Sequence, residues 1–284
     1  MHLLILGFGY SASAFAMEAR GLFSSITVTA RSPDKVARLK GEGWDALPFD
    51  GEAANPALEA AIARATHVLV SAPPGDRGDP ALRVLRDALG ASPALTRVMY
   101  LSTVGVYGDH DAQWVDEESP LRPVSLRSRQ RVEAEEGWQA FAQDKGCDLG
   151  IFRLSGIYGP GRSAIDNLRA GTARRIIKPG QVFNRIHVAD IAGALVAASR
   201  HEGRLGTFNL TDLEPAPPQD VVEFAAHLLG VPVPPDIPFE EAQLSEMGRS
   251  FYGENKRVAN GLIRSALRYR FCCPSYREGL RACL

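Results

Sequence analysis

The sequence predicts an α/β fold in which helices cover both faces of a doubly wound parallel sheet. Short apolar runs with strand character alternate with segments of helical periodicity from the first residue onward. The chain opens with an unbroken apolar run at 3–6, a glycine-containing turn and a helical pattern. Its 284 residues, of which 45% are apolar, suffice for one large domain with a smaller lobe.

The first turn has the spacing Gly7-x-Gly9-x-x-Ala12, with alanine in the place of a third glycine. An apolar stripe at i, i+3, i+4 and i+7 begins at Ala12 and predicts a helix. Gly7 permits a tight turn, Gly9 lets a phosphate approach the backbone, and the helix N-terminus attracts negative charge. The alternative is a tight turn that binds nothing. The pattern favours a site for a dinucleotide pyrophosphate, made by Gly7, Phe8, Gly9, Tyr10, Ser11 and Ala12.

The second predicted strand, at 26–29, ends next to a basic residue. An acidic residue here would accept a hydrogen bond from a ribose 2′-hydroxyl, whereas the guanidinium of Arg31 suits a 2′-phosphate. Ser32 follows directly, and Lys35 adds positive charge. We therefore expect NADP to be preferred, with NAD as the alternative cofactor and a solvated surface arginine as the plainer explanation of Arg31.

Other predicted strands end in short polar or proline-containing segments. A strand at 44–50 ends at Asp50, which either contacts an adenine or caps a turn. A strand at 67–71 runs into Ser71, Ala72 and Pro73, which are expected to border the cofactor because strand carboxyl ends face the ligand crevice. A plain turn explains these residues almost as well. The predicted helices between these strands span 33–39, 58–64 and 81–89.

The second half of the chain is less regular. A polar loop at 109–123 precedes a helix around Trp138 and a sixth strand at 147–153. A helix at 163–173, an alanine-rich helix ending near residue 200 and a strand at 207–210 follow. We predict a dinucleotide-binding domain at 1–160 and 181–215, and a small substrate lobe at 161–180 and 216–284 that closes over the crevice.

Charge and cysteine content exclude several functions. The net charge is −1, from 32 basic and 33 acidic residues, so neither nucleic acid nor an anionic membrane is an expected partner. The first apolar run is too short for a membrane span or a signal peptide, which favours a cytoplasmic protein. The four cysteines have no metal-ligand spacing, and the adjacent pair is a poor disulfide candidate, so we expect reduced thiols and no metal at Cys147, Cys272, Cys273 and Cys283.

Four motifs in order carry a family resemblance: the glycine turn, the strand end at 101–108, the segment at 153–161 and the segment at 185–191. With these motifs the chain resembles the extended and atypical short-chain dehydrogenase/reductases, which are similar to NAD-dependent epimerases and dehydratases. The resemblance implies a Rossmann domain with a C-terminal substrate lobe. It also implies that Ser102 or Thr103 holds the position of the family's catalytic hydroxyl, next to the cofactor.

The chain departs from this family at its proton-transfer pair. Active members carry Tyr-x-x-x-Lys on the helix before the sixth strand, and alignment on Glu135 puts Arg127 and Arg131 in these two positions. No tyrosine lies between Gly108 and Tyr158. Arginine does not act as a general acid or base near neutral pH, because its pKa exceeds about 12. The usual machinery is therefore missing, which is typical of the atypical subgroup.

Other residues are candidates to replace that pair. Tyr107 and Tyr158 follow strands whose ends face the crevice, and the His187 side chain titrates near neutral pH. The alternatives are aromatic packing for the tyrosines and a structural histidine bonded to Asp190 or to the backbone.

The two arginines that stand in the positions of the family's tyrosine and lysine also have two interpretations. Arg127 and Arg131 lie four residues apart on one helical face, where they either bind a substrate anion or the cofactor ribose edge, or pair with Glu135 or a neighbouring acid. Together with the previous candidates they complete the predicted site. The expected catalytic residues are Ser102, Thr103 and Tyr107; Arg131 is assigned to the cofactor, and the substrate residues are Arg127, Tyr158, Arg185, His187 and Lys256.

Basic residues near the predicted lobe favour a small anionic substrate. Lys256 stands in a polar segment that lies beside the substrate pocket in the resembled family, and Arg162, Arg174, Arg175 and Arg185 add charge, although a solvated basic face is the alternative. The sequence thus predicts an NAD(P)-dependent oxidoreductase or an epimerase/dehydratase-like enzyme, which we expect to form a homodimer. A non-catalytic NADP(H)-binding sensor or scaffold is the second hypothesis.

Overall fold

The computed structural model describes residues 1–284, apart from the side chain of Met247. The chain divides into two compact units. The first comprises Met1–Thr103, Leu126–Arg153 and Ile191–Phe208, and the second comprises Val104–Ser125, Leu154–Asp190 and Asn209–Leu284. Residues 104–125, 154–160, 181–190 and 209–215 group with the second unit, whereas the sequence analysis places them in the dinucleotide-binding domain.

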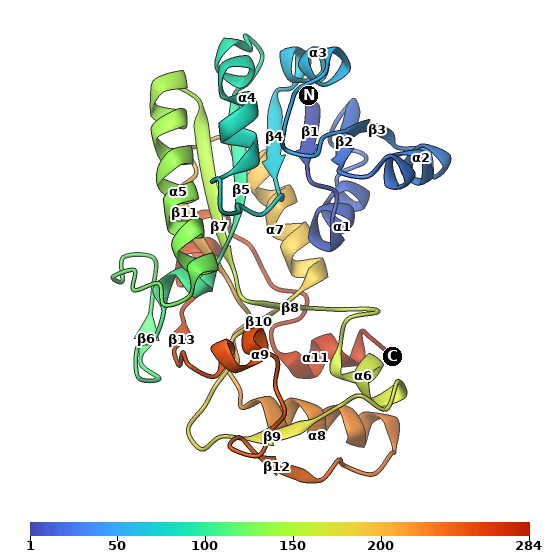
Figure 1. Cartoon of the computed structure of the whole chain (residues 1–284), viewed down its shortest axis with the longest axis vertical. Coiled ribbons are helices and arrows are strands. Elements are labelled where there is room, and N and C mark those ends of the chain that lie inside the picture. The colour runs from blue at the N-terminus through green and yellow to red at the C-terminus, as the bar shows by residue number, and fades with distance from the viewer. The chain divides into compact units, whose positions relative to one another are not determined.

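A seven-stranded parallel sheet with flanking helices forms the centre of the first unit, in the order β11-β7-β5-β4-β1-β2-β3 (Figure 1). This confirms the predicted α/β fold of Rossmann type. β1 lies between β4 and β2, and the chain crosses over from one half of the sheet to the other at this point. The strands are β1 His2–Leu6, β2 Ser25–Ala30, β3 Asp45–Pro48, β4 His67–Val70, β5 Arg97–Thr103, β7 Asp148–Leu154 and β11 Thr207–Leu210.

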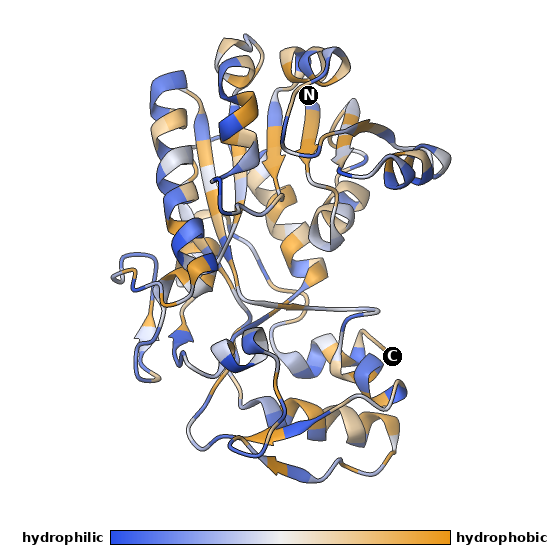
Figure 2. Cartoon of the chain, viewed as in Figure 1, coloured by the Kyte–Doolittle hydropathy of each residue, from blue (hydrophilic) through white to orange (hydrophobic). Residues whose placement is uncertain are grey.

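The central strands are apolar because both of their faces are buried. Leu3, Leu4, Ile5 and Leu6 are each at most 1% exposed. In the register of β1, Leu3 pairs with Ile26 of β2 on one side and with His67 of β4 on the other. Figure 2 shows the hydrophobic colour of β1 and β4 against the mixed pattern of the surrounding helices. An apolar run without alternation is therefore the expected signature of this position.

Helices connect successive strands of the first unit and begin at recognisable caps. The Ser32 hydroxyl accepts a hydrogen bond from the Lys35 backbone N–H, and Asn55 and Asp79 cap the next two helices in the same way. Proline occupies the first turn of all three, where its missing N–H costs nothing. The helices are α1 Tyr10–Glu18, α2 Pro33–Gly41, α3 Pro56–Arg64, α4 Pro80–Ala91, α5 Leu126–Lys145 and α7 Val188–Arg200.

One face of the sheet packs against α3, α4 and α5 in a continuous hydrophobic core. Trp138 of α5 is fully buried there, and its ring contacts Tyr100 of β5 and Phe141. The Trp138 indole N–H donates a 3.4 Å hydrogen bond to the Asp79 carboxylate, which also caps α4. This contact joins α5 to the start of α4 and fixes the angle at which the long helix crosses the sheet.

The second unit contains shorter elements than the sequence predicts. The helix expected at 163–173 is only α6 Ala164–Arg169, and the chain continues into β9 Arg175–Ile177. The polar loop at 109–123 contains the two-residue strand β6 Trp114–Val115. The remaining elements are η1 Val104–Tyr107, β8 Gly156–Tyr158, β10 Arg185–His187, α8 Pro218–Leu229, β12 Asp236–Pro238, α9 Glu246–Phe251, β13 Arg257–Val258, α10 Gly261–Ala266 and α11 Tyr276–Arg281.

Three two-stranded pairs organise the second unit: β8 with β10, β9 with β12, and β6 with β13. A hydrophobic cluster joins α6, α8 and α11 around Ile165, Ala225 and Tyr276, which are at most 1% exposed. The pairs bring distant segments together, since β13 lies more than 140 residues after β6. In the described part of the chain, no helix combines the length and apolar character that crossing a bilayer needs.

Candidate functional site

The glycine turn between β1 and α1 has the conformation that its spacing predicts. Gly7 has a φ of 92°, and a Cβ at this position would lie 2.7 Å from the Ala72 backbone nitrogen. Gly9 is the N-cap of α1, and a Cβ here would meet nothing within 4 Å. Ala12 is fully buried, so the helix packs closely behind the strand. Gly7 is required by the turn itself, and Gly9 keeps open the space next to the helix N-terminus.

Neighbouring strands hold the turn in place. The Gly7 N–H donates to the Thr29 hydroxyl and the Phe8 N–H donates to the Thr29 carbonyl oxygen, each at 2.9 Å. The Phe8 ring packs on Trp44 with ring centroids 5.0 Å apart. From α2, the Lys35 ammonium donates a 2.6 Å hydrogen bond to the Phe8 carbonyl oxygen. The turn is therefore rigid, and one cation already lies against it.

Arg31 follows β2 directly and is exposed. Within the part of the chain that the structure describes, no hydrogen bond or ion pair connects its side chain to another residue. Its neighbour Ser32 caps α2, so the backbone around Arg31 is fixed while the guanidinium stays open to solvent. Lys35 is the cation that contacts the glycine turn, whereas Arg31 follows the strand whose Thr29 holds that turn.

The other predicted cofactor residues lie at the ends of β3 and β4. The Asp50 carboxylate accepts a hydrogen bond from the Glu52 backbone N–H at 2.9 Å, so it caps a turn while remaining exposed. The Ser71 and Ala72 backbone N–H groups both donate to the Leu6 carbonyl oxygen at 2.9 Å, and Pro73 is exposed. The end of β4 thus meets the glycine turn directly, whereas β3 pairs with β2 and its end is one strand further away.

Ser102, at the end of β5, belongs to a buried polar network. Its hydroxyl donates a 2.5 Å hydrogen bond to the Glu135 carboxylate. The Arg153 guanidinium binds the same carboxylate, with Nη2 2.7 Å from Oε2 and Nε within 3.3 Å of both oxygens. All three residues are at most 5% exposed. The network ties β5, α5 and β7 together and occupies the Ser102 proton.

Arg131 does not pair with Glu135. Its guanidinium donates to the Leu101 carbonyl oxygen at 2.6 Å and to the Tyr100 hydroxyl at 3.0 Å. Burial raises the pKa of Tyr100, so this hydroxyl stays protonated and accepts the bond with its lone pair. Arg127, one turn earlier on α5, is exposed. On α5, Arg131 is therefore bound to β5, whereas Arg127 lies at the protein surface.

Thr103 and Tyr107, the other predicted catalytic residues, differ in accessibility. Thr103 ends β5 and is half-buried. Tyr107 is fully buried in the second unit, and its hydroxyl donates to the Asn209 side-chain oxygen at 2.8 Å. Among the three hydroxyls predicted for proton transfer, Ser102 and Tyr107 are thus buried and hydrogen-bonded to side-chain acceptors.

Tyr158 and His187 pack against each other in the second unit, with ring centroids 5.2 Å apart in an edge-on arrangement. The Tyr158 hydroxyl donates to the Ser275 carbonyl oxygen at 3.3 Å. His187 is 4% exposed; its Nδ1 lies 3.3 Å from the Ala189 backbone nitrogen as an acceptor, and burial lowers its pKa. This is the backbone-bonded structural histidine that the sequence analysis weighs as an alternative.

Arg185 lies near a buried acid that sequence reasoning missed. Its guanidinium donates to the carbonyl oxygens of Phe183 and Ala216 at 2.9 and 3.0 Å, and burial lowers its pKa while the charge of Asp212 opposes this effect. Asp212 is 1% exposed, and its Oδ2 has no hydrogen-bond partner. Burial raises the pKa of Asp212 to about 8. Asp212 stands in no motif or periodic pattern, so the sequence gives no signal for it.

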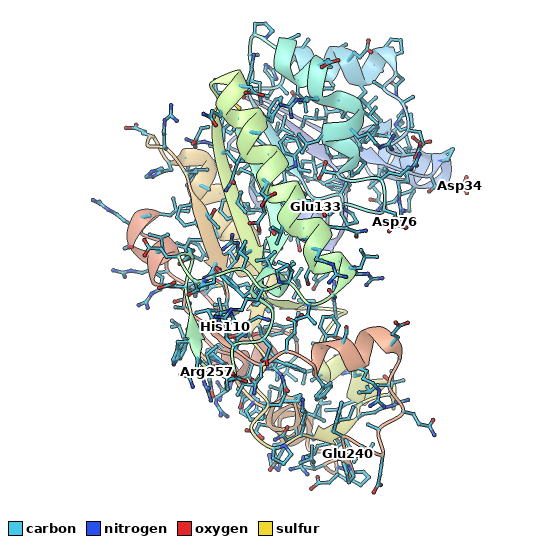
Figure 3. The ribbon with its side chains drawn as sticks, turned by 60° about the vertical axis from the view of Figure 1, so that its left-hand side comes forward. Asp34, Asp76, His110, Glu133, Glu240 and Arg257 are labelled. Atoms are coloured by element: carbon cyan, nitrogen blue, oxygen red, sulfur yellow. The ribbon has the colours of Figure 1, made fainter. Side chains whose placement is uncertain are left out.

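Lys256 is 6% exposed in the second unit. Its ammonium donates to the Gly108 carbonyl oxygen and to the Glu254 carboxylate, both at 2.7 Å. Figure 3 labels His110 and Arg257 in the same region, beside the β6–β13 pair. The lysine thus holds the loop after η1 to the segment before β13.

The predicted basic cluster of the second unit is partly neutralised. Arg175 binds the carboxylates of Glu223 and Asp236, and Arg174 donates to the Gln243 carbonyl oxygen. Both arginines are thus engaged by neighbouring acceptors, whereas the sequence analysis weighs an anion site against a solvated basic face.

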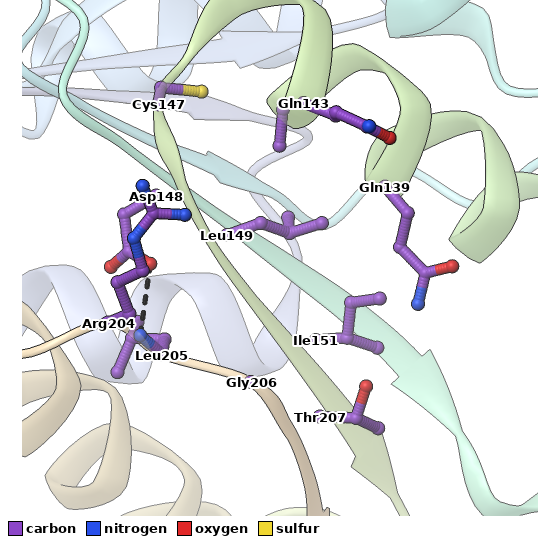
Figure 4. A pocket seen from close by; sticks show the side chains of 11 residues that line it. Gln139, Gln143, Cys147, Asp148, Leu149, Ile151, Arg204, Leu205, Gly206 and Thr207 are labelled. Atoms are coloured by element: carbon purple, nitrogen blue, oxygen red, sulfur yellow. Dashed lines mark hydrogen bonds between the residues drawn. The ribbon is translucent and has the colours of Figure 1, made fainter.

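A pocket of about 300 Å³ lies apart from these residues, along β7 and β11 (Figure 4). Gln139 and Gln143 of α5 line one side, and the Asp148 carboxylate holds the Leu205 backbone N–H at 3.0 Å on the other. It involves the start of β7, whereas the glycine turn follows the end of β1. None of the predicted site residues lines this pocket.

Sequence comparison connects the chain to a family of NAD-dependent enzymes. Residues 80–211 match the model of the NAD dependent epimerase/dehydratase family. A 3-diazoavenalumate denitrifying reductase from Streptomyces sp is 31% identical over 143 residues, which are 46% of this chain and 45% of that protein. The chain thus matches less than half the length of this relative.

Solved structures resemble the whole chain. A conserved protein of unknown function from Silicibacter pomeroyi DSS is 45% identical, with a TM-score of 0.87 over 99% of this chain and 97% of the other. UDP-glucuronic acid 4-epimerase from Bacillus cereus, solved in complex with NAD, is 16% identical, with a TM-score of 0.77 over 99% of this chain and 97% of that one. The second similarity is one of fold.

Proposed function

We propose that the chain, of which residues 80–211 match the NAD dependent epimerase/dehydratase family, is an NADP(H)-dependent oxidoreductase or epimerase-like enzyme that acts on a small anionic substrate. The observation that carries this proposal is the open glycine turn with Lys35 against it and Arg31 directly after the neighbouring strand. A nicotinamide dinucleotide bound there would supply or accept the hydride.

The glycine turn suits the pyrophosphate. The absence of a side chain at Gly9 leaves open space beside the N-terminus of α1, and the first turn of a helix has N–H groups without acceptors inside the helix. The hydrogen bonds from Gly7 and Phe8 to Thr29 fix the turn before any ligand binds. A rigid, preformed cradle reduces the entropy lost on binding.

Arg31 and Lys35 support a preference for NADP over NAD. An exposed guanidinium without a carboxylate partner can form a bidentate pair with a 2′-phosphate. Lys35 is held against Phe8, so its charge lies beside the turn. An acidic residue in the place of Arg31 would instead repel the phosphate.

The proton-transfer step is proposed to differ from that of the tyrosine–lysine enzymes. Arg131 donates hydrogen bonds to Leu101 and Tyr100, and arginine side chains in general do not act as proton donors near neutral pH. Of the three hydroxyls, we favour Thr103 as the group that contacts substrate, because it is half-buried while Ser102 and Tyr107 are buried. Ser102 then acts as a positioning residue through Glu135.

The preference for an anionic substrate rests on the arginines. Arg127 is exposed on the first turn of α5, and Arg185 lies in the second unit without a direct ion pair to a carboxylate in the part of the chain described here. Tyr158, His187 and Lys256 remain proposed substrate residues, although each also makes a structural hydrogen bond. The residues around the proposed cofactor site therefore support the catalytic proposal more strongly than the proposed substrate residues do.

A non-catalytic NADP(H) sensor is the second candidate. The buried Ser102–Glu135–Arg153 network favours it, because this network occupies the Ser102 hydroxyl proton. The two functions share the cofactor site and differ in turnover. Stopped-flow or steady-state oxidation of NADPH with a panel of carbonyl compounds, including carboxylated and phosphorylated ones, distinguishes them.

The cofactor preference is tested by changing Arg31. We expect the wild-type protein to bind NADPH at least tenfold more tightly than NADH, and Arg31→Asp to reverse this order. The reason is that one charge-assisted phosphate contact contributes about 1.5–3 kcal/mol. Quenching of protein fluorescence or calorimetric titration measures both affinities.

Arg38→Asp is the matched control for this experiment. Arg38 lies on α2, is exposed and pairs with Glu42 at 3.6 Å. It carries the same charge as Arg31 on the same segment but does not follow β2. Equal NADPH and NADH affinities before and after Arg31→Asp, or an equal effect of Arg38→Asp, would refute the assignment.

A further inference from the structure

We propose that the side chains of Asp190, Cys272 and Cys273 bind one thiophilic divalent cation such as Zn²⁺. Their ligand atoms, one carboxylate oxygen and two sulfurs, all lie within 4.8 Å of one another. Asp190 belongs to the first turn of α7, whereas the cysteines lie 82 and 83 residues later, before α11. The fold therefore assembles a donor set that the cysteine spacing alone does not indicate.

The distance between the two sulfurs fits a shared metal ion. Cys272 Sγ and Cys273 Sγ are 3.8 Å apart. Two thiolates bound to a tetrahedral zinc ion at about 2.3 Å have sulfurs about 3.8 Å apart. A disulfide needs about 2.05 Å and a strained ring between neighbouring residues. The observed separation suits coordination without rearrangement.

The Asp190 carboxylate is held in place by several hydrogen bonds. Asp190 is fully buried, and its Oδ1 accepts from the Tyr269 hydroxyl at 2.9 Å and from the Cys272 N–H at 2.7 Å. Its Oδ2 accepts from the Cys273 N–H at 3.0 Å, and the Cys272 thiol also hydrogen-bonds to this carboxylate. A cation bound to the sulfur and the carboxylate takes the place of that thiol proton. Hydrogen bonds of this kind orient ligands in metal sites.

Accessibility and donor chemistry define the cation. Cys272 is exposed and Cys273 is buried, so solvent reaches the donor set at Cys272. Three protein ligands leave a fourth tetrahedral position for water. Sulfur donors select Zn²⁺ or Cd²⁺, whereas Mg²⁺ and Ca²⁺ prefer oxygen.

Coordination of a cation requires both thiols to lose their protons. A bound cation replaces the two protons, which leave to solvent, and the two thiolates with the carboxylate then surround two positive charges with three negative ones.

The test uses the full chain, reduced and freed of metal with a chelator, then titrated with CdCl₂ and with ZnCl₂. We expect one Cd²⁺ per chain, with a thiolate-to-cadmium charge-transfer absorption in the ultraviolet. Cys272→Ser, a change at an exposed position, should abolish this absorption and weaken binding at least tenfold. Cys147→Ser, which alters a buried cysteine of the first unit, should leave both unchanged.

X-ray absorption at the zinc edge of the loaded wild-type protein tests the site without any variant. The expected first shell has two sulfur and two lighter ligands. A shell without sulfur, binding of Mg²⁺ as tight as that of Zn²⁺, or an equal loss in Cys147→Ser would overturn the proposal. A disulfide between Cys272 and Cys273 in the purified protein would lower its mass by two hydrogens. If such a protein bound no cation after reduction, the proposal would also be overturned.

Discussion

Asp212 is a buried carboxyl group whose surroundings oppose its charge. It is 1% exposed; its Oδ1 accepts one hydrogen bond, from the Glu214 N–H at 3.1 Å, and its Oδ2 accepts none. Burial raises the pKa from the ordinary 3.8 to about 8. The folded protein therefore holds a proton that the unfolded chain releases between these two pH values. The free energy of unfolding falls as the pH rises through this window.

Asp212→Asn should remove that pH dependence, because the amide does not ionise. Between pH 4.5 and pH 8, the free energy of unfolding of the wild type should fall, and that of the variant should not show this fall. The stability difference between variant and wild type should therefore be larger at pH 8 than at pH 4.5 by on the order of 3 kcal/mol. Urea unfolding at both pH values measures the difference. Asp220→Asn, an exposed change on α8, is the control. The same stability difference at both pH values would show that Asp212 is ionised in the folded protein.

Individual side chains also show which parts of the site the sequence reveals. Gly7, Gly9 and Ala12 were assignable because their spacing reflects a backbone requirement. The bond from Ser102 to Glu135 was not, since the carboxylate lies 33 residues later and its partner Arg153 a further 18 residues on. Contacts of this kind depend on which elements the fold brings together, and no local pattern records them.

At the scale of elements, α11 and β8 are in close contact at one glycine. A Cβ on Gly279 would lie 1.9 Å from the Tyr158 hydroxyl oxygen and 2.6 Å from the ring carbon that carries it. The Tyr158 ring is 8% exposed and packs on His187, so it has little room to move. The close approach of helix and strand depends on the missing side chain.

Gly279→Ala should therefore destabilise the protein by about 2–3 kcal/mol, the usual cost of overpacking a core. Thermal or urea unfolding measures the loss. Gly261→Ala in α10 introduces the same methyl group where nothing lies within 4 Å, and we expect no loss there. In a Tyr158→Ala background, where the clashing ring is absent, the same Gly279→Ala change should cost less stability than in the wild type. Equal effects of the two glycine changes would mean that this contact does not constrain the packing.

Elements were predictable in proportion to their length and burial. The strands β1 and β4 are continuous apolar runs with every residue buried or nearly so, and α5 carries Trp138 and Phe141 at helical spacing. The strands β8, β9 and β10 have only three residues each, too few for a periodic pattern. Arg175 was assigned to a basic cluster, yet it lies in β9 and binds two carboxylates.

At the scale of the whole molecule, the similarity to the Silicibacter pomeroyi protein extends over nearly all of both chains. The family model, by contrast, covers only 80–211 and therefore excludes the glycine turn and Arg31. The cofactor proposal thus rests on the geometry of the turn in this chain. The cation site concerns different residues, so either proposal can fail without the other.

The most direct test of the central claim is a crystal structure of the protein with NADPH. We predict density for the pyrophosphate against the backbone N–H groups at the start of α1, with the 2′-phosphate contacted by Arg31 and Lys35. Density for the nucleotide elsewhere, or none at saturating NADPH, would contradict the account.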